Sequence, residues 1–243
     1  MNVLAIDVGG TNVKLLATGE TERRKFASGP KMGPKQMVDA VKKIAGDWKY
    51  DVISIGYPGV VANGRIIAEP RNLAPGWCKF NFEAAFKCPV KILNDAAMQA
   101  LGSYRGGLLL FIGLGTGLGS AVVIDDVVIP MELGQLSYRK GTYEDYLGRD
   151  GLKRQGNKKW RAHLTAVVAR LIGALHPDDV VLGGGNAKKL EQLPEGCRLG
   201  SNAYAFLGGF RLWEAAVERH TSPPRLRLQR GKRRRGDARR APR

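Results

Sequence analysis

An acidic residue at the end of a predicted strand is the first candidate for chemistry. The stretch "VKILNDAAMQ" places Asn94 and Asp95 where an apolar run gives way to a helical pattern. A carboxylate at such a junction is explained well enough as a helix cap. It can equally accept the proton of a hydroxyl group that attacks phosphorus. The residues alone leave both interpretations open.

Glycine-rich turns are the second feature. The stretches "DVGGTN" and "GLGTGLGS" each place Gly beside Thr between two apolar runs, and "VVLGGGNA" adds a third glycine cluster. Backbone N–H groups in such turns can meet phosphate oxygens, and the Thr hydroxyl adds a further donor. A hairpin without any ligand needs the same glycines, so one turn alone shows little. Three such turns in one chain favour a phosphate-binding site.

Asp7 ends a buried apolar run directly before the first of these turns. A buried carboxylate destabilises the fold unless it is paired or lies near a metal ion. Magnesium held through water near a phosphate chain would account for this acid. We therefore expect Asp7 to serve a Mg²⁺ site.

Two polar residues lie three apart around a glycine in "PMELGQLSYRKG", namely Glu132 and Gln135. They either contact a substrate or lie idle on a loop.

The predicted elements that carry these residues form two similar halves. Apolar and alternating runs on either side of Gly9 and Gly10 predict a hairpin, and "ERRKFASG" could supply a third strand. The spacing of apolar residues in "GPKQMVDAVKKIAGDW" predicts a helix. "DVISIGYPG" and the strand before Asp95 follow. The second half repeats this order with "GGLLLFIGLG", "LGSAVVIDD", "VVIP", a long helix from Asn157, "DDVVLGGG" and a closing helix. This weak duplication predicts α/β lobes at 1–105 and 106–219 facing a cleft.

Size and composition exclude several classes of protein. A chain of 243 residues with 44% hydrophobic and 25% charged residues suits one large domain or two small lobes. No run of 18 apolar residues exists, so no membrane span is expected, and the first residues do not resemble a secretory signal. Three widely spaced cysteines argue against a disulfide framework and against a zinc site. We expect a cytoplasmic location.

The net charge of +17 is unevenly distributed. Residues 220–243 carry ten Arg or Lys and one Asp, a net charge of +9, which leaves about +8 for the rest. This tail has no periodicity, so we expect it to be disordered. It is either an idle solvated extension or a weak, salt-sensitive binder of anions; specific nucleic-acid binding is not expected.

A second basic run surrounds Trp160, which we expect to be a core or edge aromatic residue. Its members are Arg139, Lys140, Arg149, Lys153, Arg154, Lys158, Lys159 and Arg161. Such a run is usually a solvated helix face, yet it would also attract polyphosphate, a dense polyanion. The sequence does not exclude ATP as phosphoryl donor.

Seven motifs together resemble a known family. In chain order they are "DVGGTNVK", "GYPGVV", "EPRNLAPGW", "VKILNDAAMQALG", "GLGTGLGSAVVID", "MELGQL" and "VVLGGGNA". The set resembles the ROK family (repressor, open reading frame, kinase), and within it the polyphosphate glucokinases, over roughly residues 2–218. The resemblance implies an actin/hexokinase-like (ribonuclease H-like) fold of two lobes. It also implies a Mg²⁺-dependent sugar kinase that uses ATP or polyphosphate on a hexose 6-hydroxyl, and a homodimer as a common assembly.

The resemblance also implies roles for individual residues. Asp95 matches the catalytic base. The residues implied in sugar binding are Gly59, Asn72, Asn94, Glu132, Gln135 and Glu144. Those implied at the phosphates or nucleotide are Asp7, Gly9, Gly10, Thr11, Lys14, Gly115, Thr116, Gly117, Gly183, Gly184 and Gly185.

The sequence departs from the family at two places. Most ROK kinases carry a cysteine-rich zinc loop after the Glu-x-Gly-His motif, whereas "SYRKGTYEDYLGRDG" has no cysteine or histidine, so no zinc is predicted. Polyphosphate glucokinases lack that loop as well. Gln135 stands where the family has histidine. Its amide can both donate and accept hydrogen bonds, so it leaves two alternatives open: retained glucose binding, or a different sugar or polyol as acceptor.

A regulatory role is the main alternative to catalysis. The family includes transcriptional repressors, which carry a helix-turn-helix ahead of the first glycine turn. That turn begins here at residue 7. Asp95 is also present, which a non-catalytic, sugar-responsive regulator would not need.

Overall fold

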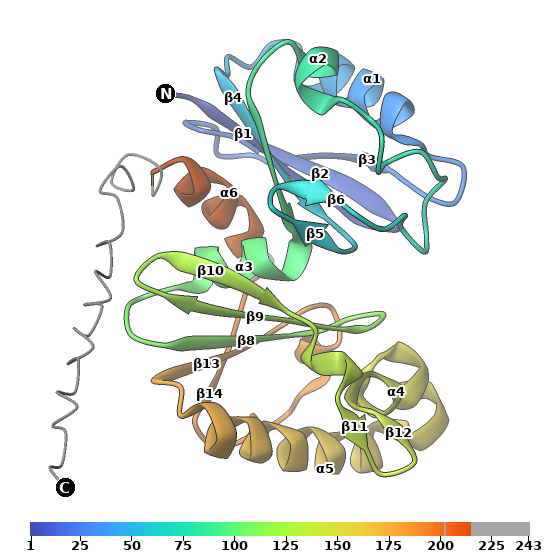
Figure 1. Cartoon of the computed structure of the whole chain (residues 1–243), viewed down its shortest axis with the longest axis vertical. Coiled ribbons are helices and arrows are strands. Elements are labelled where there is room, and N and C mark those ends of the chain that lie inside the picture. The colour runs from blue at the N-terminus through green and yellow to red at the C-terminus, as the bar shows by residue number, and fades with distance from the viewer. Residues whose placement is uncertain (202, 215–243) are drawn as a thin grey trace, which may run out of the picture.

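Two five-stranded mixed sheets form the framework of the molecule (Figure 1). The computed structural model describes residues 1–201 and 203–214. The first sheet has the order β3-β2-β1-β4-β7. Its strands are β1 (Val3–Val8), β2 (Asn12–Ala17), β3 (Arg24–Ala27), β4 (Val52–Tyr57) and β7 (Val90–Asn94).

The second sheet has the order β10-β9-β8-β13-β14. Its strands are β8 (Leu109–Leu114), β9 (Leu118–Ile124), β10 (Val127–Met131), β13 (Asp179–Gly183) and β14 (Cys197–Leu199). In both sheets an antiparallel three-stranded meander is followed by two strands added in parallel. The same topology twice confirms the duplication predicted from the sequence.

Six α-helices lie in the described part of the chain. They are α1 (Pro34–Ile44), α2 (Phe82–Phe86), α3 (Asp95–Ser103), α4 (Tyr143–Leu147), α5 (Arg149–Leu175) and α6 (Tyr204–Glu214). Figure 1 shows α1 and α2 beside the first sheet, α5 along the second, and α3 with α6 between the two sheets. Pro34 at the first turn and the buried face of Met37, Val38 and Val41 explain the start and the orientation of α1.

Helix α5 has a break that agrees with the sequence pattern. Gly156 has φ 74° and ψ 166°, so its backbone is not helical there. The predicted helix began at Asn157, directly after this break. Trp160 is fully buried, and its indole N–H donates to Leu147 O at 2.9 Å. It is therefore a core residue, as expected.

Short elements that the sequence pattern did not predict fill the loops. These are α2, α4, the hairpins β5 (Val61–Ala62) with β6 (Arg65–Ile66) and β11 (Ser137–Tyr138) with β12 (Gly141–Thr142), strand β14, and the 3₁₀ turns Leu133–Gln135 and Ala187–Lys189. Elements of two to five residues contain too little periodicity to be recognised. The predicted closing helix ends at Glu214 in the described part. The basic tail of residues 220–243 lies outside the described residues.

Helices α3 and α6 cross at two glycines. A Cβ on Gly102 would lie 1.8 Å from Tyr204 O, and one on Gly208 would lie 1.8 Å from Met98 O. No side chain fits at either position. This close crossing returns the end of the described chain to the first sheet, where the Ser54 hydroxyl donates to Gly209 O at 2.6 Å.

No helix among the described residues is long and apolar enough to cross a membrane.

Candidate active site

Asp95 begins α3 at the point where the two sheets approach each other. Asn94 caps this helix: its side-chain oxygen accepts the N–H groups of Ala96 and Ala97 at 2.9 and 3.2 Å. A Cβ on Gly119 of β9 would lie 2.8 Å from the Ala96 Cβ. The first turn of α3 therefore lies directly against the second sheet.

The environment of Asp95 suits a proton acceptor. Burial, and then the negative charge of Asp7, raise the pKa of Asp95 to about 7. A carboxyl group with a pKa near 7 accepts a proton well at neutral pH. Asn94 provides most of the helix cap, although Asp95 also accepts the Ala96 N–H at 2.8 Å.

Asp7 lies opposite Lys14 in the β1–β2 pairing. The Lys14 ammonium donates to Asp7 Oδ2 at 2.8 Å, and Asp7 is 7% exposed. This ion pair by itself accounts for the buried carboxylate. The Mg²⁺ role of Asp7 stays a prediction.

The first glycine turn joins β1 to β2 as predicted. The Gly9 N–H donates to Asn12 O at 3.0 Å, which closes the turn. A Cβ on Gly10 would lie 3.0 Å from the Asn72 Cβ, so the turn lies against the loop that carries Asn72. Thr11 is exposed beside it.

The second and third glycine turns are held together by one residue. Asn186 donates through its side-chain amide to Gly115 O at 3.0 Å and through its backbone N–H to Leu114 O at 2.9 Å. Gly184 has φ 82°, a backbone conformation that favours glycine. Sequence reasoning named Gly183, Gly184 and Gly185 but missed Asn186. Its position directly after these glycines was the available signal.

Thr116 and Gly117 lie against α4 and the start of α5. Arg149 N–H donates to Thr116 O at 3.1 Å. A Cβ on Gly117 would lie 2.4 Å from Glu144 Oε2, which accepts the Leu118 N–H at 3.0 Å. Glu144 therefore lies beside the second glycine turn.

Glu132 and Glu144 lie close enough to influence each other. Loss of water around the Glu132 carboxyl, and then the charge of Glu144, raise the pKa of Glu132, while Arg71 lowers it. Arg71 Nη1 lies 3.4 Å from Glu144 Oε1. Sequence reasoning missed Arg71, although it directly precedes Asn72 in "EPRNLAPGW".

Glu69 holds the loop that carries Arg71 and Asn72. Its carboxylate accepts the N–H groups of Gly76 and Trp77, both at 3.0 Å. Arg71 and Asn72 are exposed on this loop. Their side chains are thus presented by a fixed backbone.

Gln135 and Gly59 occupy different surroundings. Gln135 ends a 3₁₀ turn and is exposed, and its side chain makes no hydrogen bond to any described residue. Gly59 lies behind Asn94, whose side-chain amide donates to Gly59 O at 3.0 Å. A Cβ on Gly59 would lie 2.7 Å from the Tyr57 ring, so its role in the described structure is close packing.

The basic run around α5 divides into paired and unpaired side chains. Arg161 forms an ion pair with Glu191 at 2.7 Å, and Arg154 donates to Asp145 O at 2.6 Å. The exposed lysines have no hydrogen-bond or ion-pair partner among the described residues; they are Lys140, Lys153, Lys158 and Lys159. The run therefore includes a solvated face.

The donor set fits a magnesium ion held mainly through water. Among the described residues, no group of three or more histidine, cysteine or acidic side chains is placed to hold a metal ion. Mg²⁺ beside phosphates needs only one or two carboxylates. Asp7 is the candidate, and its charge also acts on Asp95. The predicted lack of zinc stays a prediction.

A model described as the ROK family matches residues 3–132, more than half of the chain. The chain belongs to the ROK family. A polyphosphate glucokinase of Mycobacterium tuberculosis (strain CDC 1551 / Oshkosh) is 27% identical over 210 residues, 77% of this chain and 78% of that protein.

Solved structures show that this ROK chain has the actin/hexokinase-like α/β fold. An inorganic polyphosphate/ATP-glucomannokinase from Arthrobacter sp. strain KM has a TM-score of 0.74 at 21% identity, covering 89% of this chain and 98% of the other. A ROK family glucokinase from Streptomyces griseus, solved with glucose and AMPPNP, has a TM-score of 0.66 at 18% identity, covering 86% and 97%. The family and the fold implied by the motifs are thereby confirmed.

Proposed function

We propose that this ROK protein is a sugar kinase that transfers a phosphoryl group to a hexose hydroxyl, with the glucose 6-hydroxyl as the first choice. One observation carries the proposal. Asp95 is a half-buried carboxyl at a helix start, with its pKa raised to about 7, at the junction of the two sheets that carry the glycine turns. The named kinases among its relatives support the same reading.

The chain's own residues perform three tasks in this reaction. Asp95 accepts the proton of the sugar hydroxyl as the hydroxyl oxygen bonds to the terminal phosphorus of the donor, and the donor's bridging oxygen leaves with its electron pair. N–H groups of the three glycine turns stabilise the phosphate charge. Asp7 would hold Mg²⁺ through water, and the ion would neutralise charge on the donor phosphates.

The sugar is oriented by side chains from both halves. Glu132, Glu144 and Asn72 offer acceptors and donors to its hydroxyl groups, and Asn94 has one amide hydrogen left after its bond to Gly59. We propose lobes at 1–105 and 106–219 as the units that enclose it. The unpaired lysines of the basic run support polyphosphate as a donor besides ATP.

Two further features belong to the proposal. The three cysteines, none in a disulfide, support a reducing compartment such as the cytoplasm. A homodimer, as the family resemblance implies, is tested by sedimentation of the purified protein.

A coupled assay with Mg²⁺ tests the function directly. Hexoses and polyols are crossed against ATP and polyphosphate. We expect glucose to be phosphorylated with at least one donor. Turnover of another sugar or polyol alone would show that the acceptor is not glucose. If the folded protein turned over no combination of acceptor and donor, a non-catalytic, sugar-responsive regulator would be favoured.

Replacing Gln135 by histidine tests the acceptor site. We expect Gln135→His to lower KM for glucose about threefold to tenfold with little change in kcat, the effect of roughly one hydrogen bond. The exposed, unpartnered amide leaves room for the ring. Gln135→Ala is the matched control and should raise KM. An unchanged KM in both variants would show that position 135 does not contact the sugar.

Removing Arg71 tests the carboxylate pair. Arg71→Ala is expected to raise the pKa of Glu132 further, so KM for the sugar should rise more at pH 6 than at pH 8. The free energy of unfolding should change by less than about 1 kcal/mol, because the ion pair with Glu144 is exposed on its Arg71 side. Arg23→Ala, an exposed arginine elsewhere, is the control. Equal KM changes at both pH values would contradict this role.

A further inference from the structure

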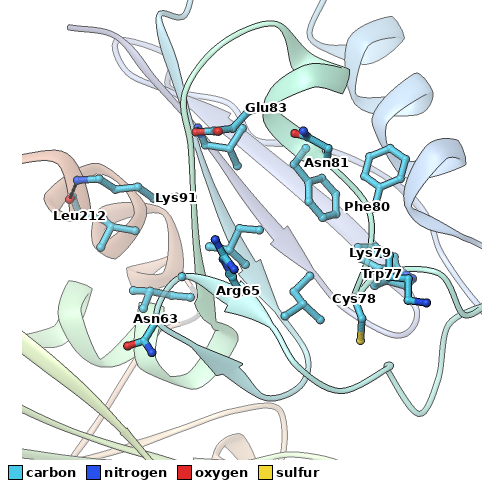
Figure 2. Close-up of a pocket in the computed structure, with 16 residues that line it drawn as sticks. Asn63, Arg65, Trp77, Cys78, Lys79, Phe80, Asn81, Glu83, Lys91 and Leu212 are labelled. Carbon is cyan, nitrogen blue, oxygen red and sulfur yellow. Dashed lines mark hydrogen bonds between the residues drawn. The ribbon is translucent and has the colours of Figure 1, made fainter.

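A cavity lies away from the candidate active site, beside the first sheet (Figure 2). Its volume is about 780 Å³, and none of its lining residues belongs to the set assigned to the sugar or the phosphates. It lies between β7, the hairpin β5–β6, the segment from Trp77 to Glu83, and Leu212 of α6. Nothing in the proposed kinase reaction uses it.

Among the described residues, no strand pairs with the outer edge of β7, and the cavity runs along this open edge. Four consecutive residues of this strand line it, Val90–Leu93. Successive side chains of a strand point to opposite faces, so four in a row can line one hollow only if the hollow follows the strand's edge. The sheet order places β7 at that edge.

The register identifies which backbone groups face the cavity. The Ile53 N–H donates to Pro89 O at 3.0 Å, and parallel pairing uses every second residue. Lys91 and Leu93 therefore also bond to β4, whereas Val90 and Ile92 turn their N–H and C=O groups outward. The Val90 N–H meets Glu83 Oε1 at 3.4 Å, a long contact.

An aromatic wall stands opposite the strand. Trp77 and Phe82 have ring centroids 6.0 Å apart, and Phe80 and Phe82 4.8 Å apart. Trp77 is 1% exposed and Phe82 4%, so the base of this wall is fixed. Phe80 is only half-buried, so it is the ring of this wall against which an apolar side chain of an added strand would pack.

The positive charge around the cavity favours an acidic partner. The lining contains three basic side chains and one acidic side chain, which gives it a net charge of +2; they are Arg65, Lys79, Lys91 and Glu83. Figure 2 shows Arg65 in the middle of the site, between Lys91 and Phe80. Arg65 and Lys79 have no hydrogen-bond or ion-pair partner among the described residues. The net +9 of residues 220–243 makes the chain's own tail a poor fit, and a second copy would oppose like charges.

We propose that the open edge of β7 binds an extended acidic segment of another protein as an added strand. The outward N–H and C=O groups of Val90 and Ile92 supply the main-chain hydrogen bonds, and the Val90 N–H gives up its 3.4 Å bond to Glu83 when the strand is added. The half-buried Phe80 ring receives an apolar side chain, and Arg65 and Lys79 pair with acidic side chains beside it. This inference does not depend on the kinase function.

The test uses the full chain and a fluorescein-labelled peptide of alternating valine and glutamate. We expect saturable binding by fluorescence anisotropy that weakens with salt. The double variant Arg65→Glu with Lys79→Glu should weaken it by about tenfold or more, since like charges then oppose each other. Lys43→Glu, an exposed lysine on α1, is the matched control and should bind as the unmodified protein does. Hydrogen exchange should slow at Val90 and Ile92 when the peptide binds.

Several outcomes would overturn the proposal. Equal binding of a valine–lysine peptide, or of the glutamate peptide by the double variant, would show that this site does not select acids. Binding without slower exchange at Val90 and Ile92 would place the peptide elsewhere. If exchange at Val90 and Ile92 were already slow in the free, dilute protein, the occupant of this edge would be the chain's own tail. If exchange slowed only when the protein self-associates, the occupant would be a second copy. Polyphosphate binding at these residues, with no peptide binding, would assign it to a simple anion.

Discussion

Asp95→Asn is expected to lower kcat by about 10³-fold, within the range that general base catalysis contributes, while the melting temperature stays equal or rises. Asparagine keeps an oxygen that can accept the Ala96 N–H, so the helix start is preserved. It cannot accept the sugar proton. It also removes a buried negative charge next to that of Asp7. Steady-state kinetics and thermal unfolding of the same preparation check both parts.

The pH profile of the unmodified protein gives an independent check. Because the pKa of Asp95 is raised to about 7, the carboxyl is protonated below that pH and cannot act as a base. We expect kcat/KM to fall about tenfold per pH unit below pH 7. Asp39→Asn, an exposed acid on α1, is the control and should leave the profile unchanged. Substantial turnover by Asp95→Asn would refute the assignment of the base.

Gly102→Ala is expected to destabilise the fold by about 3 kcal/mol, at the upper end for overpacking. The added Cβ would lie 1.8 Å from Tyr204 O, and a backbone atom cannot move aside by changing a rotamer. The melting temperature should fall by about 10 °C in a protein of this size. Because α3 begins at Asp95, any separation of α3 from α6 also moves the Asp95 carboxyl, so kcat should fall as well.

A matched glycine makes this prediction specific. Gly173 lies in α5, and a Cβ there would meet nothing within 4 Å. Gly173→Ala should therefore stabilise the helix by about 0.5–1 kcal/mol. Chemical denaturation compares the two variants. If Gly102→Ala unfolded at the same denaturant concentration as Gly173→Ala, the close helix crossing would not hold in solution.

Much of the fold followed from local patterns in the sequence. Apolar runs joined by Gly9–Gly10 and by the turn around Gly115 predicted hairpins, and both form. The strand-to-helix junction at Asp95 was also predicted, because a polar residue at the end of an apolar run is a local signal. The repetition of this order predicted two similar sheets. The long helix was predicted to begin at Asn157, and the structure has a break in α5 at Gly156, directly before that residue.

Only the tertiary structure decided which of these local elements meet. Arg71 and Glu144 are 73 positions apart, and Asn186 and Gly115 are 71 apart, yet each pair is in contact. No periodicity records such pairs, because they depend on which distant strands and loops the fold places side by side, as when β13 pairs with β8. The open edge of β7 is a further case, since a strand becomes an edge only when no other strand is placed beside it. The sequence thus determined the turns, the strand-to-helix junction at Asp95 and the repeated topology, whereas long-range packing determined their partners.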